Sequence, residues 1–388
     1  MAAFQYEAYM SAFHPDFKIG VLGGGQLGRM MIQSAIDFNF NVHTLDPDPN
    51  APCKAISTSF TVGKLTDFDT VYQFGQDKDL ITIEIENVNT EALHKLQDEG
   101  KKVYPQPQVI ELIKNKSVQK KFYTDNGIPT AAYVETQNKE DVARQKHLLP
   151  FVNKLATEGY DGRGVQVIKT EADLDKAFDK PGFVEALVDF EKEISVIVAR
   201  NEAGEMKTFP TVEMVFHPVH NLVEYLFSPA QISQQIEEKA QAIAKSVIQK
   251  LDMVGLLAIE MFVTREGEVL VNEMAPRTHN SGHQSIEGNV TSQFEQHLRS
   301  ILNLPLGATE NVIPSAMVNL LGADGYTGDA VYEGMDSLLA TPGVHVHLYG
   351  KKITKPFRKM GHVTIADHDL DQLKEKAKFV KEHLTIKA

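Results

Sequence analysis

The sequence has 388 residues, of which 42% are hydrophobic and 23% are charged, and its formal net charge is −13. These values are ordinary for a globular chain of two or three domains, and the negative charge excludes an overall attraction for nucleic acid or an anionic membrane. The single cysteine, Cys53, excludes an internal disulfide and fits the cytoplasm, where we expect the protein to work. The first fifteen residues hold no Lys or Arg, so we expect no signal peptide, and no apolar run is long enough for a membrane helix.

The first predicted elements are a strand over 18–24 and a helix over about 26–40. Between them Gly23, Gly25 and Gly28 have the G-x-G-x-x-G spacing that brings backbone amides to a phosphate. Strands at 41–46 and 79–85 alternate with helical patterns, which predicts a doubly wound parallel sheet over about 17–105.

Asp46 follows these glycines at roughly the 20-residue distance at which NAD-dependent dehydrogenases place a ribose-binding acid. An oxidoreductase is therefore one candidate function. This hypothesis gives no role to the polar residues that follow further along the chain.

The next predicted element is one helix over about 109–126, which ends at the "NGIP" sequence. Short strands around a glycine-rich hairpin at 157–168 follow, and then a long amphipathic helix over 232–254. Strands at 256–264 and 269–276 are joined by the turn "REGE". A helix near 291–303 precedes a small all-β or α+β appendage over 311–388.

Two carboxylates, Glu260 and Glu273, fall inside the paired apolar strands, and Asn272 precedes the second. Buried carboxylates are unfavourable unless they are paired or bound to metal, and such hard oxygen ligands suit Mg²⁺ on nucleotide phosphates. The plainer alternative is a salt bridge to Arg265 or Arg277.

The stretch "GYDGRG" at 159–164 can bring its amides close to a phosphate, and Lys154 precedes it. An exposed turn is the plainer alternative, but a turn needs no Tyr160 or Arg163. Glu185 and Glu193, further along, could contact an adenine edge and ribose hydroxyls, or could lie on a solvated edge strand.

Two further polar clusters favour anion recognition. Arg277, His279, Asn280 and His283 crowd into a loop whose "NSG" sequence argues against a helical zinc pair. A probable hairpin at 349–365 carries Lys351, Lys352, Lys355, Arg358 and Lys359, a basic group in an acidic chain or simply a solvated face.

In their order, these segments resemble the ATP-grasp ligases and, among them, the family of N5-carboxyaminoimidazole ribonucleotide synthetases of purine biosynthesis. The resemblance covers about residues 18–365. It rests on these strings: "GGGQLGRM", "ITIEIENV", "GYDGRG", "AIEMFVT", "VNEMAPRTHNSGH", "SQFEQHLR" and "RKMGHV".

The resemblance implies an α/β and α+β architecture with a small β-rich C-terminal appendage. The implied parts are a Rossmann-like domain at 17–115, an ATP-grasp domain at 116–310 with a mobile lid at about 130–200, and a C-terminal domain at 311–388. It also implies ATP- and bicarbonate-dependent carboxylation of aminoimidazole ribonucleotide through carboxyphosphate, with Mg²⁺ (two ions, or Mn²⁺), no biotin and a homodimer.

Residue roles also follow from the resemblance. The ATP contacts it implies are Lys116, Lys154, Gly159, Tyr160, Asp161, Gly162, Arg163, Gly164, Val165, Glu185, Ala186, Leu187, Val188, Glu193, His217, Asn272 and Glu273. The metal ligands are Glu260 and Glu273. The catalytic residues are Tyr160, Asp161, Arg163, Arg277 and His279. The ribonucleotide contacts are Gly25, Gln26, Leu27, Glu84, Asn280, Lys351 and Arg358.

Within the same superfamily a formate-dependent glycinamide ribonucleotide transformylase is an alternative, and a non-catalytic nucleotide-binding module is another. No Met-Lys-Met sequence of the kind that carries biotin is present. Asp161 is the general base that we expect, with Arg163 fixing the anion.

Overall fold

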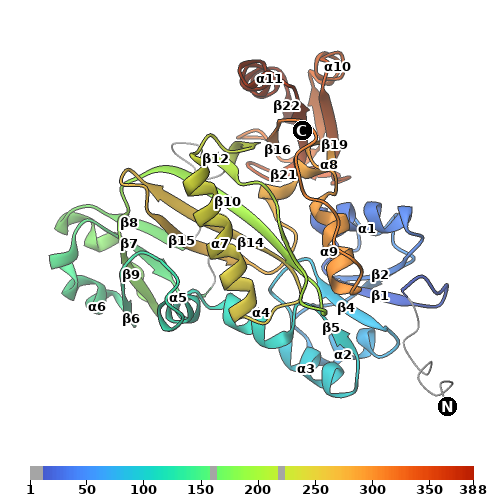
Figure 1. Cartoon of the computed structure of the whole chain (residues 1–388), viewed down its shortest axis with the longest axis horizontal. Coiled ribbons are helices and arrows are strands. Elements are labelled where there is room, and N and C mark those ends of the chain that lie inside the picture. The colour runs from blue at the N-terminus through green and yellow to red at the C-terminus, as the bar shows by residue number, and fades with distance from the viewer. Residues whose placement is uncertain (1–11, 158–163, 217–222) are drawn as a thin grey trace.

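The computed structural model describes residues 12–157, 164–216 and 223–388. Within these residues the strands form three larger sheets (Figure 1). The predicted fold class, a parallel N-terminal sheet followed by an ATP-grasp-like body and a small β-rich C-terminal part, is confirmed. None of the described helices is both long and apolar enough to cross a bilayer.

The N-terminal sheet is parallel and has the order β3-β2-β1-β4-β5. Its elements are β1 (Lys18–Leu22), α1 (Gln26–Asp37), β2 (Asn41–Asp46), β3 (Ser59–Val62), α2 (Phe68–Gly75), β4 (Leu80–Ile83), α3 (Thr90–Asp98) and β5 (Lys102–Val103). The strands β1 and β4 are almost wholly buried, as their continuous apolar runs predict.

The predicted single helix over 109–126 is wrong, because two helices occupy this stretch: α4 (Pro107–Lys114) and α5 (Lys116–Asp125). Asn115 between them has an extended backbone, and its side chain accepts hydrogen bonds from the amides of Ser117 and Val118. An Asn side chain that caps the next helix competes with continuation of the previous one.

A four-stranded antiparallel sheet follows, in the order β6-β9-β7-β8. Its elements are β6 (Tyr133–Thr136), α6 (Lys139–Arg144), η1 (Lys146–Leu148), β7 (Phe151–Leu155), β8 (Val165–Ile168), η2 (Glu171–Lys176) and β9 (Gly182–Ala186). The strands β7 and β8 pair from Phe151 with Ile168 to Lys154 with Val165, so they form the two arms of the predicted glycine hairpin.

The large sheet runs β15-β14-β10-β12-β13-β16-β21-β19, with β11 beside β10. Its first strands are β10 (Phe190–Arg200), β11 (Met206–Thr208), β12 (Val212–Phe216), β13 (Val223–Ser228), β14 (Gly255–Thr264) and β15 (Val269–Ala275). The amphipathic helix α7 (Gln234–Lys250) packs Ala240, Ala244 and Val247 onto β10 and β14.

The chain then passes through η3 (Asn280–Gly282), α8 (Ser285–Gly288) and α9 (Gln293–Ile301). The C-terminal elements are β16 (Ser315–Leu321), β17 (Gly328–Asp329), β18 (Val331–Glu333), α10 (Met335–Leu339), β19 (Val344–Leu348), β20 (Ile353–Thr354), β21 (Lys359–Ala366), α11 (Leu370–His383) and β22 (Thr385–Lys387). The C-terminal part is thus α+β, and β16, β21 and β19 continue the large sheet rather than forming a separate one.

Candidate functional site

Glu260 on β14 and Glu273 on β15 lie directly opposite each other across the two antiparallel strands. Glu273 forms an ion pair with Lys116 at the start of α5. Glu260 Oε1 lies 3.7 Å from His279 Nε2. The two arginines proposed as salt-bridge partners bind elsewhere: Arg277 pairs with Glu86 at 2.9 Å and Arg265 with Asp189 at 3.4 Å. That alternative is wrong.

The two carboxyl groups differ in their ionisation. Lys116 holds the pKa of Glu273 well below its usual range, because the ammonium stabilises the carboxylate. Burial and the neighbouring charge of Glu273 raise the pKa of Glu260. Glu193 on β10 lies on the same face of the sheet, and burial raises its pKa to about 7.

These residues fit Mg²⁺ bound together with nucleotide phosphates. Glu260 and Glu273 offer hard carboxylate oxygens side by side, and the Glu273 side chain is 40% exposed, so a phosphate can reach it. The described residues hold no group of three or more His, Cys, Asp or Glu that could bind a metal by itself. The pair therefore suits an ion whose remaining ligands come from phosphate and water.

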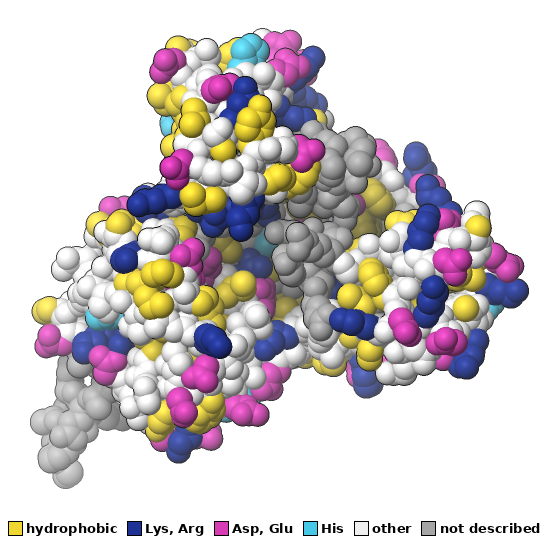
Figure 2. Space-filling model, turned by 180° about the vertical axis from the view of Figure 1, so that it is seen from behind, with side chains coloured by type: hydrophobic (Ala, Val, Ile, Leu, Met, Phe, Trp, Pro, Cys, Tyr) yellow, Lys and Arg dark blue, Asp and Glu magenta, His cyan; other side chains and the backbone are white. Residues whose placement is uncertain are grey.

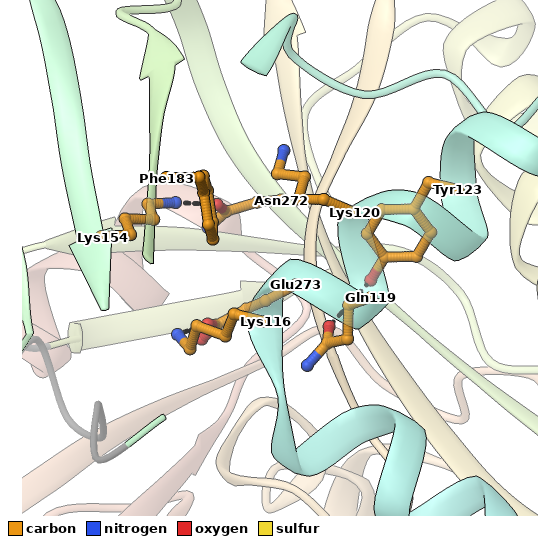
Figure 3. Close-up of a pocket in the computed structure, with 8 residues that line it drawn as sticks. All are labelled: Lys116, Gln119, Lys120, Tyr123, Lys154, Phe183, Asn272 and Glu273. Atoms are coloured by element: carbon orange, nitrogen blue, oxygen red, sulfur yellow. Dashed lines mark hydrogen bonds and ion pairs between the residues drawn. The ribbon is translucent and has the colours of Figure 1, made fainter. Parts of the chain in front are cut away.

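A pocket beside this pair is lined from four elements (Figure 3). Its lining residues are Lys116, Gln119, Lys120 and Tyr123 of α5, Lys154 of β7, Phe183 of β9, and Asn272 and Glu273 of β15. Lys154 Nζ donates to Asn272 Oδ1 at 2.9 Å, which joins the four-stranded sheet to the large one. Four of the predicted ATP contacts therefore meet at one pocket, and the last of them is also a predicted metal ligand: Lys116, Lys154, Asn272 and Glu273.

Lys120 is a pocket residue that the sequence reasoning missed. It is 2% exposed, its Nζ lies 2.7 Å from Glu185 Oε2, and it donates to Thr130 Oγ1 at 2.6 Å. Lys116, Lys120 and Tyr123 share one face of α5, and this spacing of two lysines and an aromatic residue is the signal that could have revealed it.

The predicted nucleotide segment 185–188 starts at the end of β9, an inner strand of the four-stranded sheet. The alternative of a solvated edge strand is therefore wrong for Glu185, which is 4% exposed and also pairs with Lys154. Burial opposes its ionisation, but Lys154 and Lys120 lower the pKa of Glu185. The exposed Leu187 follows, so the chain turns outward after Ala186.

Several predicted residues lie outside the described residues: Gly159, Tyr160, Asp161, Gly162, Arg163 and His217. Gly164 and Val165 follow them at the start of β8, and Gly164 has a positive φ of 76°. The carbonyl of Gly164 accepts from the amide of Leu155 at 2.9 Å, which closes the base of the hairpin.

The glycine loop at the N-terminus of α1 is partly filled by the chain's own carboxylates. The amide of Gly24 donates to Asp46 Oδ2 at 2.7 Å, and the amide of Gly25 donates to Glu84. A Cβ added at Gly25 would lie 2.2 Å from Glu84 Oε1. Asp46 is thus turned toward the loop, and Glu84 occupies an amide of the kind that a dinucleotide's pyrophosphate binds in this motif.

The C-terminal part of the chain contacts the glycine loop and the start of α1. Lys351 Nζ donates to Oε1 of Gln26, the first residue of α1, at 2.8 Å. Arg358 lies on the same connection between β19 and β21 and donates to the carbonyl of Ile353 at 2.6 Å. Figure 2 shows Lys and Arg side chains gathered where the upper, C-terminal lobe meets the body below it. The predicted bounds of the hairpin, 349–365, are wrong, because β19 at 344–348 pairs with β21 at 359–366. Residues 349–358, which hold four of the five basic residues, connect the two strands.

The polar loop that follows β15 connects the carboxylate pair to other parts of the chain. Arg277 reaches back to Glu86 beyond β4, and His279 caps η3 next to Glu260. Asn280 forms two hydrogen bonds with Asn319 of β16, at 2.9 and 3.1 Å. This loop therefore joins the carboxylate pair to both the N-terminal sheet and the C-terminal strands.

Three family models match the chain in succession. The ribonucleotide synthetase preATP-grasp domain matches residues 17–114, the ATP-grasp domain residues 121–294, and the phosphoribosylaminoimidazole carboxylase C-terminal domain residues 315–376. The N5-carboxyaminoimidazole ribonucleotide synthase of Bacillus subtilis is 38% identical over 366 residues, which cover 92% of this chain and 94% of that protein. The chain belongs to this family.

Solved structures agree with this assignment. The N5-carboxyaminoimidazole ribonucleotide synthetase of Thermotoga maritima is 42% identical with a TM-score of 0.89, covering 96% of this chain and 99% of that one. The Aspergillus clavatus synthase, in complex with ADP and 5-aminoimidazole ribonucleotide, is 33% identical with a TM-score of 0.87, covering 95% and 98%. The chain is therefore an ATP-dependent ligase that forms a C–N bond, not an oxidoreductase and not a non-catalytic module.

Proposed function

We propose that this enzyme carboxylates the amine of 5-aminoimidazole ribonucleotide with bicarbonate, at the expense of ATP, in purine biosynthesis. Bicarbonate oxygen attacks the γ-phosphorus, which gives carboxyphosphate and ADP. The amine then attacks the carboxyl carbon and phosphate leaves, or carboxyphosphate first releases phosphate and CO₂ and the amine attacks that CO₂. As the new C–N bond forms, the amine gives one proton to Asp161, the expected general base, or to the phosphate.

The observation that carries this proposal is the position of Glu260 and Glu273 between a lysine-lined pocket and a polar loop. On one side lies the pocket with Lys116 and Lys154, and on the other lie His279 and the loop to Arg277. Phosphoryl transfer depends mainly on positioning and on neutralising charge, and this arrangement supplies both next to a second substrate.

We assign the ATP end to the pocket and to Glu185 through Val188, with Glu193 nearby. Lys154 is fixed by Asn272 and Glu185, so its ammonium is placed before the nucleotide arrives. Mg²⁺ held by Glu260 and Glu273 would neutralise phosphate charge when it is bound. The assignment of Tyr160, Asp161 and Arg163 to bicarbonate remains a proposal from the family resemblance.

We assign the ribonucleotide end to the N-terminus of α1, where the helix dipole favours an anion. Since Asp46 and Glu84 occupy the amides of Gly24 and Gly25, the 5′-phosphate would meet the amides of Gln26 and Leu27 together with Lys351 and Arg358. Glu84 and Asn280 remain proposed contacts of the ribose and base, and Arg277 and His279 of the reacting amine.

The family resemblance supports four further proposals. They are Mg²⁺ as the metal, a homodimer, a cytoplasmic location, and the division of the chain at about residues 115 and 310. Sedimentation of the purified protein tests the dimer.

Acceptor-dependent ADP release tests the function itself. With ATP and Mg²⁺, bicarbonate plus 5-aminoimidazole ribonucleotide should raise ADP release far above the rate with ATP alone. Formate plus glycinamide ribonucleotide should not. The reverse pattern would assign the enzyme to the transformylases instead.

A further inference from the structure

Tyr349 lies beneath the proposed phosphate site, where the N-terminal sheet and the C-terminal strands meet. It follows β19 and is 1% exposed. Its ring belongs to the same buried cluster as Leu27 and Met31 of α1 and Phe294 of α9. The amide of Tyr349 donates to the carbonyl of Met360 at 3.0 Å. Both its backbone and its ring are therefore held in place.

The hydroxyl of Tyr349 is held as well. It lies 3.0 Å from Nδ1 of His362, a fully buried histidine on β21. Burial raises the pKa of Tyr349 and lowers the pKa of His362, so both groups are neutral and share one hydrogen bond, whose donor depends on the tautomer of His362. A buried hydroxyl without a partner would be unfavourable, so this bond restricts where the ring can lie.

His362 is itself fixed by a neighbouring ring. It stacks on His347 of β19, with ring centroids 4.4 Å apart and an interplanar angle of 8°. His347 Nε2 lies 2.8 Å from Glu287 Oε1 on α8. A column of polar side chains therefore runs from α8 through two strands to the Tyr349 hydroxyl.

The Tyr349 ring is in contact with Lys351. The Lys351 ammonium lies 5.4 Å from the ring centroid, within the range of a cation–π contact. The same ammonium donates to Gln26 Oε1 and, at 2.7 Å, to the carbonyl of Lys359. Without the ring, a lysine on a flexible four-carbon stem would sample more positions around α1.

We propose that Tyr349, oriented by His362, is a positioning residue for the ribonucleotide 5′-phosphate, because it fixes the Lys351 ammonium at the N-terminus of α1. This inference rests on the proposed function. It adds a residue that does not touch the substrate and acts only through Lys351.

The test compares Tyr349→Phe, Tyr349→Leu, Lys351→Ala and the double variants in steady-state assays of the whole enzyme. Loss of the hydroxyl should raise KM for 5-aminoimidazole ribonucleotide by about threefold, and loss of the ring by about tenfold, as expected for a weakened cation–π contact. The KM for ATP should stay the same, and kcat should change by less than about twofold. In the Lys351→Ala background neither Tyr349 substitution should raise this KM further.

Substitutions of His362 give an independent test of the same proposal. His362→Asn keeps an acceptor near the position of Nδ1, whereas His362→Leu removes it, so only the leucine variant should raise KM for the ribonucleotide. Tyr72→Phe is the matched control, because Tyr72 lies on α2 and its hydroxyl donates to Glu99 at an exposed position away from the site.

The outcomes separate the two proposals. If Lys351→Ala raises KM for the ribonucleotide but the Tyr349 variants only lower thermal stability, Tyr349 is a purely structural residue and the inference is wrong. Equal losses from Tyr349 substitutions with and without Lys351 would overturn it too. If Lys351→Ala leaves this KM unchanged, the proposed phosphate contact fails, and the inference fails with it.

Discussion

At the residue scale, the carboxylate pair is asymmetric before any ligand arrives. Lys116 lowers the pKa of Glu273, whereas burial and Glu273 raise the pKa of Glu260. A metal ligand must be deprotonated, so binding of a cation would draw the proton from Glu260. On the proposed assignment, the pair would bind the ion together with nucleotide phosphates rather than hold it alone.

Replacing Glu273 with Gln keeps the shape of the side chain and removes its charge. We expect kcat for acceptor-dependent ADP release to fall by at least about 100-fold, because charge neutralisation around the transferred phosphoryl group is lost. Glu266→Gln, at the exposed turn of the same β14–β15 hairpin, is the matched control and should behave like the native enzyme. Native turnover in Glu273→Gln would remove this residue from the metal site.

Glu84 gives the folded protein a pH-dependent stability. Burial raises its pKa from an ordinary 4.5 to about 7, although hydrogen bonds from Gly25 and Gly28 favour the charged form. As pH rises from about 4.5 to about 7, the unfolded chain releases this proton before the folded chain does. The stability that protonated Glu84 contributes is therefore lost over this range, and its loss is complete above about pH 7. Denaturant titrations measure the free energy of unfolding at pH 5 and at pH 8. Its decline between the two pH values should be about 1–3 kcal/mol smaller in Glu84→Gln than in the native protein. Equal declines in the two proteins would contradict the raised pKa of Glu84.

At the element scale, the break between α4 and α5 places the functional side chains of α5. The helix restarts at Lys116, so Lys116, Lys120 and Tyr123 point into the pocket together. A continuous helix would impose one rotation on both segments. Because the backbone of Asn115 is extended, the orientation of α5 is independent of that of α4.

Asn115→Ala should therefore lower the free energy of unfolding by about 1 kcal/mol, because two amides of α5 lose their acceptor. It should also raise KM for ATP, since Lys116 is the next residue. Asn115→Asp retains the acceptor oxygen and should retain stability. Denaturant unfolding of the three proteins checks this, and a fully stable Asn115→Ala variant would show that packing alone separates the helices.

Many elements could be predicted because their cause is local. The strand β1 and most of β14 are apolar runs, β2 carries polar residues between its buried apolar ones, and the pairing of β14 with β15 follows from a short turn. The break at Asn115 was missed because helix propensity on both sides outweighed one capping residue. Lys120 was missed because its partner Glu185 comes from a distant strand, and the only local signal was its helical spacing from Lys116 and Tyr123 on α5.

The site could be predicted as a set of residues but not as a geometry. The resemblance named Lys351 and Gln26 separately, whereas their contact depends on how the C-terminal strands continue the large sheet. Similarly, the glycine pattern suggested amides free for phosphate, and only the structure shows Asp46 and Glu84 on them. Such contacts depend on which strands pair with each other, and these strands lie far apart in the sequence.

At the scale of the whole molecule, the hydrophobic clusters cross the sequence divisions. One cluster joins Ile19 of β1 and Met30 of α1 to Phe294 and Leu298 of α9 and to Tyr349. Another joins Val109 of α4 to β10 and β14. The parts are therefore expected to unfold together.

Phe294→Ala tests this cooperativity. Removing this 1% exposed ring should lower the free energy of unfolding by about 3–5 kcal/mol. Calorimetry should still show one transition, shifted to lower temperature, with the N-terminal sheet and the large sheet melting together. Two separated transitions would mean that the parts are stable by themselves.

The most direct measurement of the central claim follows the oxygen atoms. The native enzyme is supplied with ATP, 5-aminoimidazole ribonucleotide and freshly dissolved ¹⁸O-labelled bicarbonate, and the released phosphate is analysed by mass spectrometry. If bicarbonate oxygen attacks ATP, one labelled oxygen should appear in phosphate for each ADP formed. Phosphate free of label under conditions in which the carboxylated ribonucleotide accumulates would contradict the carboxyphosphate route.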